Sequence, residues 1–171
     1  MPRMRSEPVL HNRALMALLS MFAIAVLLLS GCACNPSLAE QKVAEGCGTW
    51  QGGIIRGPVD HKRIALAFTG HGYAEGADTI LKELARHHAH ASFFLTGSFL
   101  TNRDFALLVK RMDREGHYIG PHSDAHLLYC AWDAARKTLV TREQFAADLA
   151  ANAAKLPKSA RKSTRFFLPP F

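Results

Sequence analysis

The sequence predicts an α/β protein in which short apolar strands alternate with helices around a parallel sheet, as an open sheet or part of a (β/α) barrel. Four apolar runs of strand length occur after residue 60 of the 171-residue chain, segments with helical periodicity separate them, and polar or Gly- and Pro-containing turns follow them. Hydrophobic residues make up 49% of the chain, which excludes disorder of the whole chain. We expect about four βα units.

Each predicted element rests on a local pattern. Apolar runs typical of buried strands predict strands at 63–68, 91–95, 117–120 and 165–168. Apolar residues at helical spacing predict helices at 78–88, at 101–116 and at 141–157. Thr101 is the expected cap of the second helix, and Thr141 with Gln144 matches a capping box at the start of the third.

The first thirty residues match an export signal. Arg3, Arg5 and Arg13 precede an apolar stretch at 14–29, as the basic and apolar regions of a secretory signal do. The stretch is shorter than the about 20 residues of a membrane span, so a transmembrane anchor is the weaker alternative. Residues 29–32, Leu-Ser-Gly-Cys, are similar to the lipidation site of bacterial lipoproteins, with Cys32 as the lipid acceptor.

We therefore expect three parts: a lipoprotein signal peptide at 1–31, a tether at 32–60 rich in Gly and Pro, and a folded domain at 61–171. The lipid would hold the exported protein on the membrane of the bacterial cell envelope.

The remaining cysteines and the charge add two expectations. Disulfides persist in the envelope, where Cys34 and Cys47 have the option of pairing, whereas Cys130 is expected to be a buried thiol. The formal net charge is +7, but the basic residues form no single stripe. A nucleic-acid partner is not expected, because it also conflicts with export.

Candidate site residues follow the ends of predicted strands, where parallel α/β folds carry their chemistry. His71 follows the first strand, and His122 and His126 follow the third. Four-residue spacing in a helical turn would direct the last two rings to one side, within reach of one metal ion. Zinc accepts imidazole nitrogen, so a divalent metal, zinc first, is the expected cofactor. A hydrogen-bonded pair of surface histidines is an alternative of equal weight.

Three stretches resemble the polysaccharide deacetylases, carbohydrate esterase family 4. Residues 115–126, EGHYIGPHSDAH, are similar to the family's His-Ser-x-x-His block with its preceding Gly-His-x-Ile-Gly. Residues 91–97, ASFFLTG, resemble its second strand, and residues 165–170, RFFLPP, resemble its third motif. The resemblance implies a partial (β/α) barrel of the polysaccharide deacetylase type over 61–171. The implied activity is metal-dependent removal of acetyl groups from sugars or amino sugars of envelope or wall glycan.

The resemblance also implies roles for single residues. It makes His122 and His126 metal ligands and gives Arg165 a catalytic role, orienting a carboxylate or lining the substrate groove. Pro169 and Pro170 would form a wall of that groove. Trp132, which follows the histidine pair, has the option of stacking on a sugar ring, with simple packing as the equal alternative.

Two departures from the family pattern qualify this interpretation. Residues 67–72, AFTGHG, lack both aspartates of the family's first motif, Thr-Phe-Asp-Asp-Gly, in which one serves as base and the other as metal ligand. His71 is the nearest candidate for either role, with Glu75 and Asp124 as weaker ones.

The second departure is length. Residues 61–171 are fewer than the about 200 that (β/α) barrels need, so we expect the N-terminal portion of such a domain. Both departures favour an alternative function: a non-catalytic envelope lipoprotein that keeps a glycan-binding half barrel.

Overall fold

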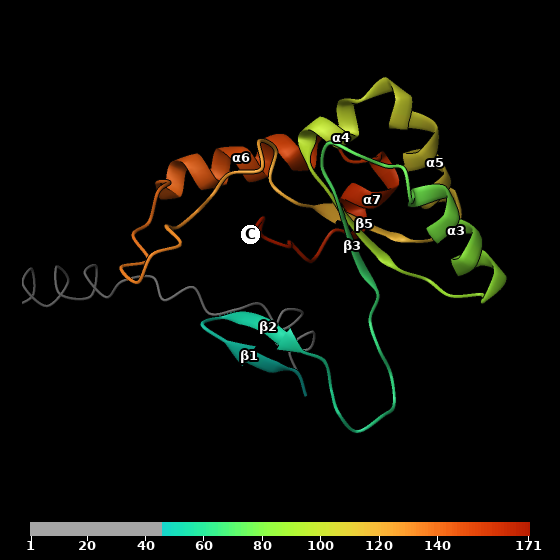
Figure 1. Cartoon of the computed structure of the whole chain (residues 1–171), viewed down its shortest axis with the longest axis horizontal. Coiled ribbons are helices and arrows are strands. Elements are labelled where there is room, and N and C mark those ends of the chain that lie inside the picture. The colour runs from blue at the N-terminus through green and yellow to red at the C-terminus, as the bar shows by residue number, and fades with distance from the viewer. Residues whose placement is uncertain (1–45) are drawn as a thin grey trace, which may run out of the picture. The chain divides into compact units, whose positions relative to one another are not determined.

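The computed structural model describes residues 46–171 (Figure 1). It divides between Lys62 and Arg63 into two units, which are described separately. The predicted signal peptide at 1–31, the lipid acceptor Cys32 and the Cys34 half of the suggested disulfide lie outside the described residues. Within residues 46–171, no helix has the length and apolar character needed to cross a membrane.

The first unit contains a hairpin where the sequence analysis expects loop. Strands β1 (Gly48–Trp50) and β2 (Gly53–Arg56) pair antiparallel. Gln51 and Gly52 both have positive φ, 48° and 80°, the backbone that two-residue hairpin turns require. All residues of both strands are exposed. Without a buried face, the sequence has no alternation of apolar and polar residues here, and that alternation is the pattern from which strands are predicted.

The second unit is built on a three-stranded parallel sheet, which confirms the α/β class. Strands β3 (Ala67–Gly70), β4 (Ser92–Leu95) and β5 (Tyr118–Pro121) lie in the order β3-β4-β5. Parallel strands bring their carboxyl ends to one edge of the sheet. The segments after all three strands therefore begin at the same edge, and they carry His71, Thr96 and His122.

The predicted fourth strand at 165–168 is wrong, although the segment does run beside β5. The N–H of Leu168 donates to the carbonyl oxygen of Pro121 at 3.3 Å. At the other end, the Tyr118 hydroxyl accepts from the N–H groups of Arg165 (3.1 Å) and Phe166 (2.8 Å) and donates to the Phe166 carbonyl (2.9 Å). A side chain thus takes the place of the backbone partners that a strand would need.

The first strand is displaced from its predicted position. The apolar run at 63–68 predicts a strand, but β3 starts only at Ala67 and continues through Thr69 and Gly70, which the prediction left outside it. Ile64 is 87% exposed. Register with β4 explains the shift, because Ala67 pairs with Ser92 and Gly70 with Leu95. The extent of the partner strand, and not apolar content, sets where β3 begins.

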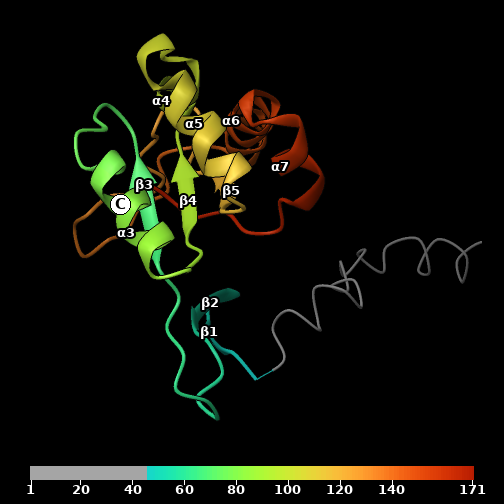
Figure 2. The same cartoon turned by 90° about the vertical axis from the view of Figure 1, so that its right-hand side faces the viewer.

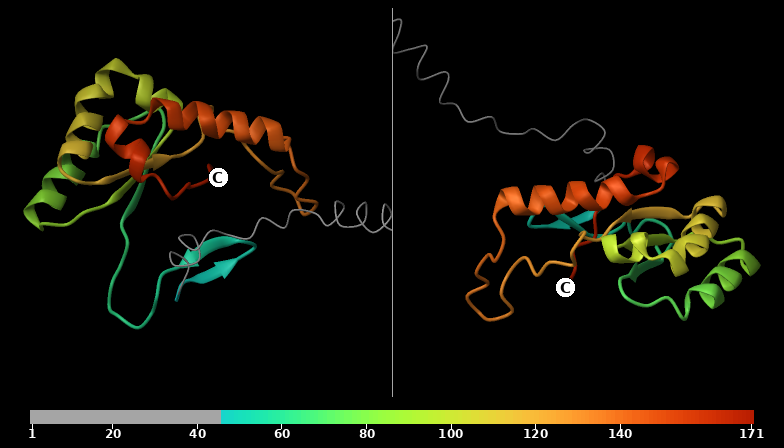
Figure 3. Two further views of the ribbon diagram at one scale, coloured as in Figure 1. Left: turned by 180° about the vertical axis from the view of Figure 1, so that it is seen from behind. Right: turned by 90° about the horizontal axis from the view of Figure 1, so that it is seen from above.

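Helices surround this sheet. They are α3 (Ala77–Arg86), α4 (Gly97–Thr101), the 3₁₀ helix η1 (Arg103–Phe105), α5 (Ala106–Arg114), α6 (Arg142–Lys155) and α7 (Lys158–Ser163). Helices α3 and α5 lie on the same side of the sheet, and α6 and α7 lie beyond β5 (Figure 2). Seen from behind, α6 leads into α7 and the C-terminal segment turns back beside the sheet (Figure 3). Leu81, Phe93, Met112 and Ile119 form the centre of the core.

Two cap predictions had opposite outcomes. The capping box of α6 is confirmed, since the Thr141 hydroxyl accepts from the Gln144 N–H at 3.2 Å and the Gln144 side chain accepts from the Thr141 N–H at 2.7 Å. The cap predicted at Thr101 is wrong: Thr101 is the last residue of α4, and Thr96 caps that helix by accepting from the Phe99 N–H. The predicted helix at 101–116 is thus divided: Thr101 ends α4, η1 takes Arg103–Phe105, and α5 begins only at Ala106.

A buried histidine at the start of β5 makes the stability of the fold sensitive to acid. His117 accepts from the Ala91 N–H through Nδ1 at 3.4 Å, while its Nε2 lies 3.7 Å from a Glu115 carboxylate oxygen without a hydrogen bond. Burial lowers the pKa of His117; Glu115 opposes this shift, and His90 and Arg111 add to it. The unfolded chain therefore binds the proton more readily than the folded one.

We accordingly expect the free energy of unfolding to fall as the pH drops below about 6.5, the ordinary pKa of histidine. His117→Gln keeps an acceptor for Ala91 but does not titrate, so its loss of stability between pH 7.5 and pH 5 should be smaller than that of the wild type. Urea unfolding at the two pH values measures this difference. Equal losses in both proteins would contradict the assignment to His117.

Candidate functional site

Three histidines from two strand ends meet in one cluster. The ring centres of His71 and His126 are 4.4 Å apart and nearly parallel, and those of His122 and His126 are 5.3 Å apart and nearly perpendicular. His71 follows β3, whereas the other two lie on the segment after β5. The structure thus brings together the three histidines that the sequence singled out, which are called the histidine cluster below.

The environment keeps two of these rings in their neutral form. Burial is the main cause that lowers the pKa of His122, and the nearby His71 ring adds to it. Burial also lowers the pKa of His126, helped by His71 and His122. The carbonyl oxygen of Leu168 accepts from His122 Nδ1 at 2.7 Å, which opposes the shift of His122 but fixes its proton on that nitrogen. Neutral imidazoles are the form in which histidine binds metal.

The segment that carries His122 and His126 is not the helical turn expected from their spacing. Residues 122–126, the histidine loop, form no helix, and both Ser123 (φ 68°) and His126 (φ 55°) have left-handed backbone. Such a conformation is unfavourable for residues other than glycine and asparagine, and it persists only where neighbouring contacts impose it. The rings of His122 and His126 still meet, because the loop folds back on itself.

Two polar side chains of α6 impose this conformation. Asp148 accepts from the N–H groups of Asp124 (3.0 Å) and Ala125 (2.9 Å), one on each carboxylate oxygen. Asn152, which is fully buried, accepts from the His122 N–H at 3.1 Å and donates to the Leu95 carbonyl at 3.1 Å. Helix α6 therefore ties the histidine loop to the end of β4.

Sequence reasoning missed Asp148 and Asn152. It predicted the helix at 141–157 from apolar residues at helical spacing, but the residues that α6 itself buries are Asp148 and Asn152. The four-residue spacing of the two polar side chains was the available signal, because it places them on one face of the helix.

A glycine after β4 sits directly against the histidine loop. A Cβ on Gly97 would lie 2.6 Å from the Asp124 Cγ and 2.8 Å from its carbonyl oxygen. We expect Gly97→Ala to displace the loop and to reduce the free energy of unfolding by about 1–3 kcal/mol, the usual cost of overpacking. Gly76→Ala is the matched control, because a Cβ there meets nothing within 4 Å. Urea unfolding of the two variants tests this, and equal midpoints would refute it.

The predicted sugar-binding residues share a pocket beside the cluster. Trp132, Pro169 and Pro170 line a pocket of about 230 Å³, called the aromatic pocket below. Phe171 lines it too and connects it with the cluster, since its ring centre is 4.6 Å from that of His126 and 5.9 Å from that of Trp132. Trp132 is 71% exposed and so presents its ring to solvent, not to the core.

Cys130 lies in the same pocket and is exposed, so the expectation of a buried thiol is wrong. It pairs with Thr138 in an isolated bridge within the extended loop before α6.

Other predicted site residues lie elsewhere or are engaged. Arg165 is exposed, and its backbone N–H donates to the Tyr118 hydroxyl at 3.1 Å. No hydrogen bond or ion pair within residues 46–171 joins its side chain to a histidine of the cluster, and its catalytic role stays a prediction. The Asp124 carboxylate pairs with Lys155, at 2.6 and 2.8 Å from Nζ.

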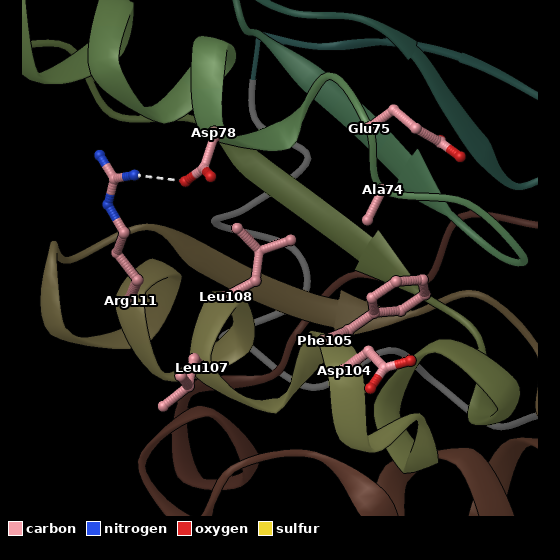
Figure 4. Close-up of a pocket in the computed structure, with 8 residues that line it drawn as sticks. All are labelled: Ala74, Glu75, Asp78, Asp104, Phe105, Leu107, Leu108 and Arg111. Atoms are coloured by element: carbon pink, nitrogen blue, oxygen red, sulfur yellow. Dashed lines mark hydrogen bonds and ion pairs between the residues drawn. The ribbon is translucent and has the colours of Figure 1, made fainter.

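The weaker candidate Glu75 lines a larger pocket of about 430 Å³ between α3 and the η1–α5 segment (Figure 4). Asp104, Asp78 and Arg111 also line it, and Asp78 pairs with Arg111 at 2.9 Å. Because no histidine lines this pocket, we place the chemistry at the histidine cluster.

As the side chains stand, no three His, Cys, Asp or Glu residues within 46–171 are arranged to hold a metal ion. The donor set of the cluster nevertheless suits a metal. With Zn–N bonds of about 2.0–2.1 Å at a tetrahedral angle, two imidazoles on one zinc ion have ring centres about 5 Å apart. His122 and His126 meet this condition.

Comparisons with known proteins identify the family of this chain. The family profile described as polysaccharide deacetylase matches residues 56–171. The chain is 41% identical over 71 residues to the peptidoglycan-N-acetylmuramic acid deacetylase PdaA of Bacillus subtilis, a match that covers 41% of this chain and 26% of that protein. It is 37% identical over 70 residues to a peptidoglycan-N-acetylglucosamine deacetylase of Bacillus cereus, covering 41% of this chain and 25% of the relative.

A solved structure is similar as well. A family 4 carbohydrate esterase from Bacillus anthracis superposes with a TM-score of 0.58 at 25% identity, over 80% of this chain and 59% of that one. The chain spans about a quarter of the length of the curated relatives it matches.

Proposed function

Because this chain belongs to the polysaccharide deacetylase family, we propose that it removes acetyl groups from sugars of envelope or wall glycan in a metal-dependent hydrolysis. The observation that carries the proposal is the meeting of His71, His122 and His126 beside the aromatic pocket. Two relatives are named as deacetylases of N-acetylmuramic acid and N-acetylglucosamine in peptidoglycan. Peptidoglycan is therefore the substrate class that we expect.

His122 and His126 would hold the metal, zinc first because imidazole suits zinc better than it suits magnesium or calcium. Such a cation acts as a Lewis acid towards an acyl carbonyl and makes water more acidic. The Leu168 carbonyl holds the His122 ring in the tautomer whose Nε2 lone pair is available, and the buried amide of Asn152 fixes the backbone of that residue. These contacts orient the ligand before anything binds.

The aromatic pocket supplies the place for the sugar. Trp132 offers an exposed ring face, and aromatic faces stack on the apolar faces of sugar rings. Pro169 and Pro170 close the pocket next to it. The Phe171 ring would lie between His126 and a sugar stacked on Trp132. The acetyl group of that sugar would then reach the histidine cluster along the Phe171 ring.

The proposed location follows from the substrate and from the N-terminal residues. Peptidoglycan lies outside the cytoplasmic membrane, and residues 1–31 have the pattern of a lipoprotein signal. We propose that Cys32 carries the lipid and that residues 32–60 tether the domain at 61–171 to the envelope membrane.

A non-catalytic glycan-binding role is the second candidate, and one observation favours it. Deacetylation needs a group that takes a proton from water. Both carboxylates at the histidine loop are engaged, Asp124 with Lys155 and Asp148 with two backbone N–H groups. The first family motif contributes none, because residues 69–71 are Thr-Gly-His.

Acetate release decides between the two roles. We expect the full chain to release acetate from N-acetylated peptidoglycan or chitooligosaccharides. Acetate release should stop after treatment with a chelator and resume when zinc is added. Binding of the same glycans without acetate release, and without sensitivity to chelator, would instead support the second role. Gly97→Ala serves as a site-disrupted control in the same assay.

A further inference from the structure

We propose that Arg136 binds a carboxylate on the sugar in the aromatic pocket, so that the pocket prefers an anionic sugar unit to a neutral one. The inference rests on the proposed function and deepens it, because that function leaves open which of two peptidoglycan sugars is bound. N-Acetylmuramic acid carries a lactyl carboxylate where no peptide is attached to it, and N-acetylglucosamine carries none. Arg136 lines the aromatic pocket together with Trp132.

The extended loop before α6 places these two side chains opposite each other. Backbone hydrogen bonds join the two arms of the loop, and the last of them runs from the Ala131 N–H to the Lys137 carbonyl at 2.8 Å. Trp132 and Arg136 each lie one residue beyond this bond, on either side of the tip of the loop. Side chains that face each other across such a pair of arms are close enough to contact one ligand together.

A turn at the tip fixes the backbone from which the arginine extends. The Asp133 carbonyl accepts from the Arg136 N–H at 3.1 Å, and the Asp133 carboxylate accepts from the Ala135 N–H at 3.1 Å. Arg136 has left-handed backbone, with φ 47°, a conformation that neighbouring contacts must impose on a residue with a side chain. The Asp133 carboxylate therefore bonds to the turn and forms no ion pair with the guanidinium.

The charge of Arg136 is uncompensated. No Asp or Glu lines the aromatic pocket, and no ion pair or side-chain hydrogen bond within residues 46–171 engages the guanidinium. In the larger pocket, by contrast, Arg111 is held by Asp78 at 2.9 Å and by Glu115 at 2.6 Å. The donors of the Arg136 guanidinium are thus available to a ligand, and their planar fork matches the two oxygens of a carboxylate.

The rest of the lining favours a carboxylate that belongs to a sugar. Trp132 offers an exposed ring face on which the apolar face of a sugar stacks, and Pro169 and Pro170 add walls without charge. Such walls strengthen the attraction between the guanidinium and an anion beside them. A small inorganic anion would use the guanidinium alone, whereas a carboxylated sugar uses the arginine and the tryptophan together. A hexuronate presents the same chemistry with its carboxylate directly on the ring.

Calorimetric titration of the full chain tests the inference without depending on acetate release. The probes are the peptide-free disaccharide of N-acetylglucosamine and N-acetylmuramic acid, the neutral methyl ester of its lactyl group, and N,N′-diacetylchitobiose. We expect the charged disaccharide to bind at least about 10-fold more tightly than the two neutral ones, and this preference should weaken as salt is added. A hyaluronan tetrasaccharide, which carries ring carboxylates, distinguishes a hexuronate from the lactyl group as the source of the anion.

Variants assign the preference to one side chain. Arg136→Gln should bind the charged disaccharide no more tightly than the neutral ones. Arg136→Lys should recover part of the preference, because lysine keeps the charge but not the planar fork. Lys137→Gln is the matched control: it removes the same charge from the next residue, which is exposed and does not line the pocket, so it should keep the wild-type preference. Circular dichroism checks that each variant is folded.

The outcomes separate this inference from the proposed function. If the wild type binds no charged probe more tightly than the neutral ones, or if Arg136→Gln keeps the preference, the carboxylate site is refuted even where acetate is released. If the preference depends on Arg136 but no acetate is released, the site stands and the deacetylase proposal fails. A preference for the hyaluronan tetrasaccharide alone, lost in Arg136→Gln, supports the site with a hexuronate as its ligand. If the folded wild type binds none of these glycans, the inference is refuted as well.

Discussion

Replacing either histidine of the loop should reduce zinc affinity and acetate release by at least about 100-fold, because each variant removes one of the two imidazoles proposed to hold the metal. His126→Asn is the cleaner variant. Asparagine tolerates left-handed backbone, so it accommodates the φ of 55° at this position without unfolding the loop. His122→Ala should cost stability in addition, because it leaves the partly buried Leu168 carbonyl without its donor.

Acetate release, zinc affinity and the urea midpoint are measured on both variants, with His87→Ala as the matched control. The expected pattern is loss of metal and activity in both loop variants, with a lowered urea midpoint only in His122→Ala. Full activity in a folded His126→Asn protein would mean that the cluster is not the reaction site.

The second large effect should come from Asn152, which would contact neither the metal nor the sugar but bonds to the backbone of His122. Asn152→Leu removes the acceptor of the His122 N–H and the donor to the Leu95 carbonyl, two buried backbone groups. An unpaired buried polar group costs about 1–3 kcal/mol, so we expect the free energy of unfolding to fall by about 2–5 kcal/mol. Zinc affinity should fall as well, because the loop is no longer tied to the end of β4.

Ala151→Leu is the control for this variant, since it introduces the same side chain at an exposed neighbouring position of α6. Asn152→Asp tests the mechanism further. It keeps an acceptor for His122 but sets a carboxylate oxygen against the Leu95 carbonyl, so it should not restore the wild-type midpoint. A wild-type midpoint in Asn152→Leu would show that the amide does not hold the loop.

The elements that the sequence predicted correctly are those with a local cause. The capping box at Thr141 and Gln144 involves residues three apart, and the apolar run that became β4 is buried at three of its four residues. The positions of His71, His122 and His126 after strands also followed from local patterns, because the parallel sheet then brings their backbones to one edge.

The errors have a non-local cause. Residues 165–168 are as apolar as a strand, but the Tyr118 hydroxyl takes the backbone groups of Arg165 and Phe166, 47 and 48 residues away. In the same way, Asp148 and Asn152 gain their role only when α6 docks against the histidine loop. Helical periodicity treats such polar residues as a solvent face, and here they form the buried one.

Because side chains of α6 hold the histidine loop, the residues of these contacts must be kept, whereas the surface segment between the loop and α6 is free to vary in sequence. Residues 130–140, which carry Trp132 and Cys130, take no part in holding the histidines. If the chain acts on glycan as proposed, insertions or exchanges in that stretch should alter which glycan is accepted while the geometry of the histidine cluster is kept. New specificities would then arise by lengthening or replacing a surface segment, without change to the histidine cluster.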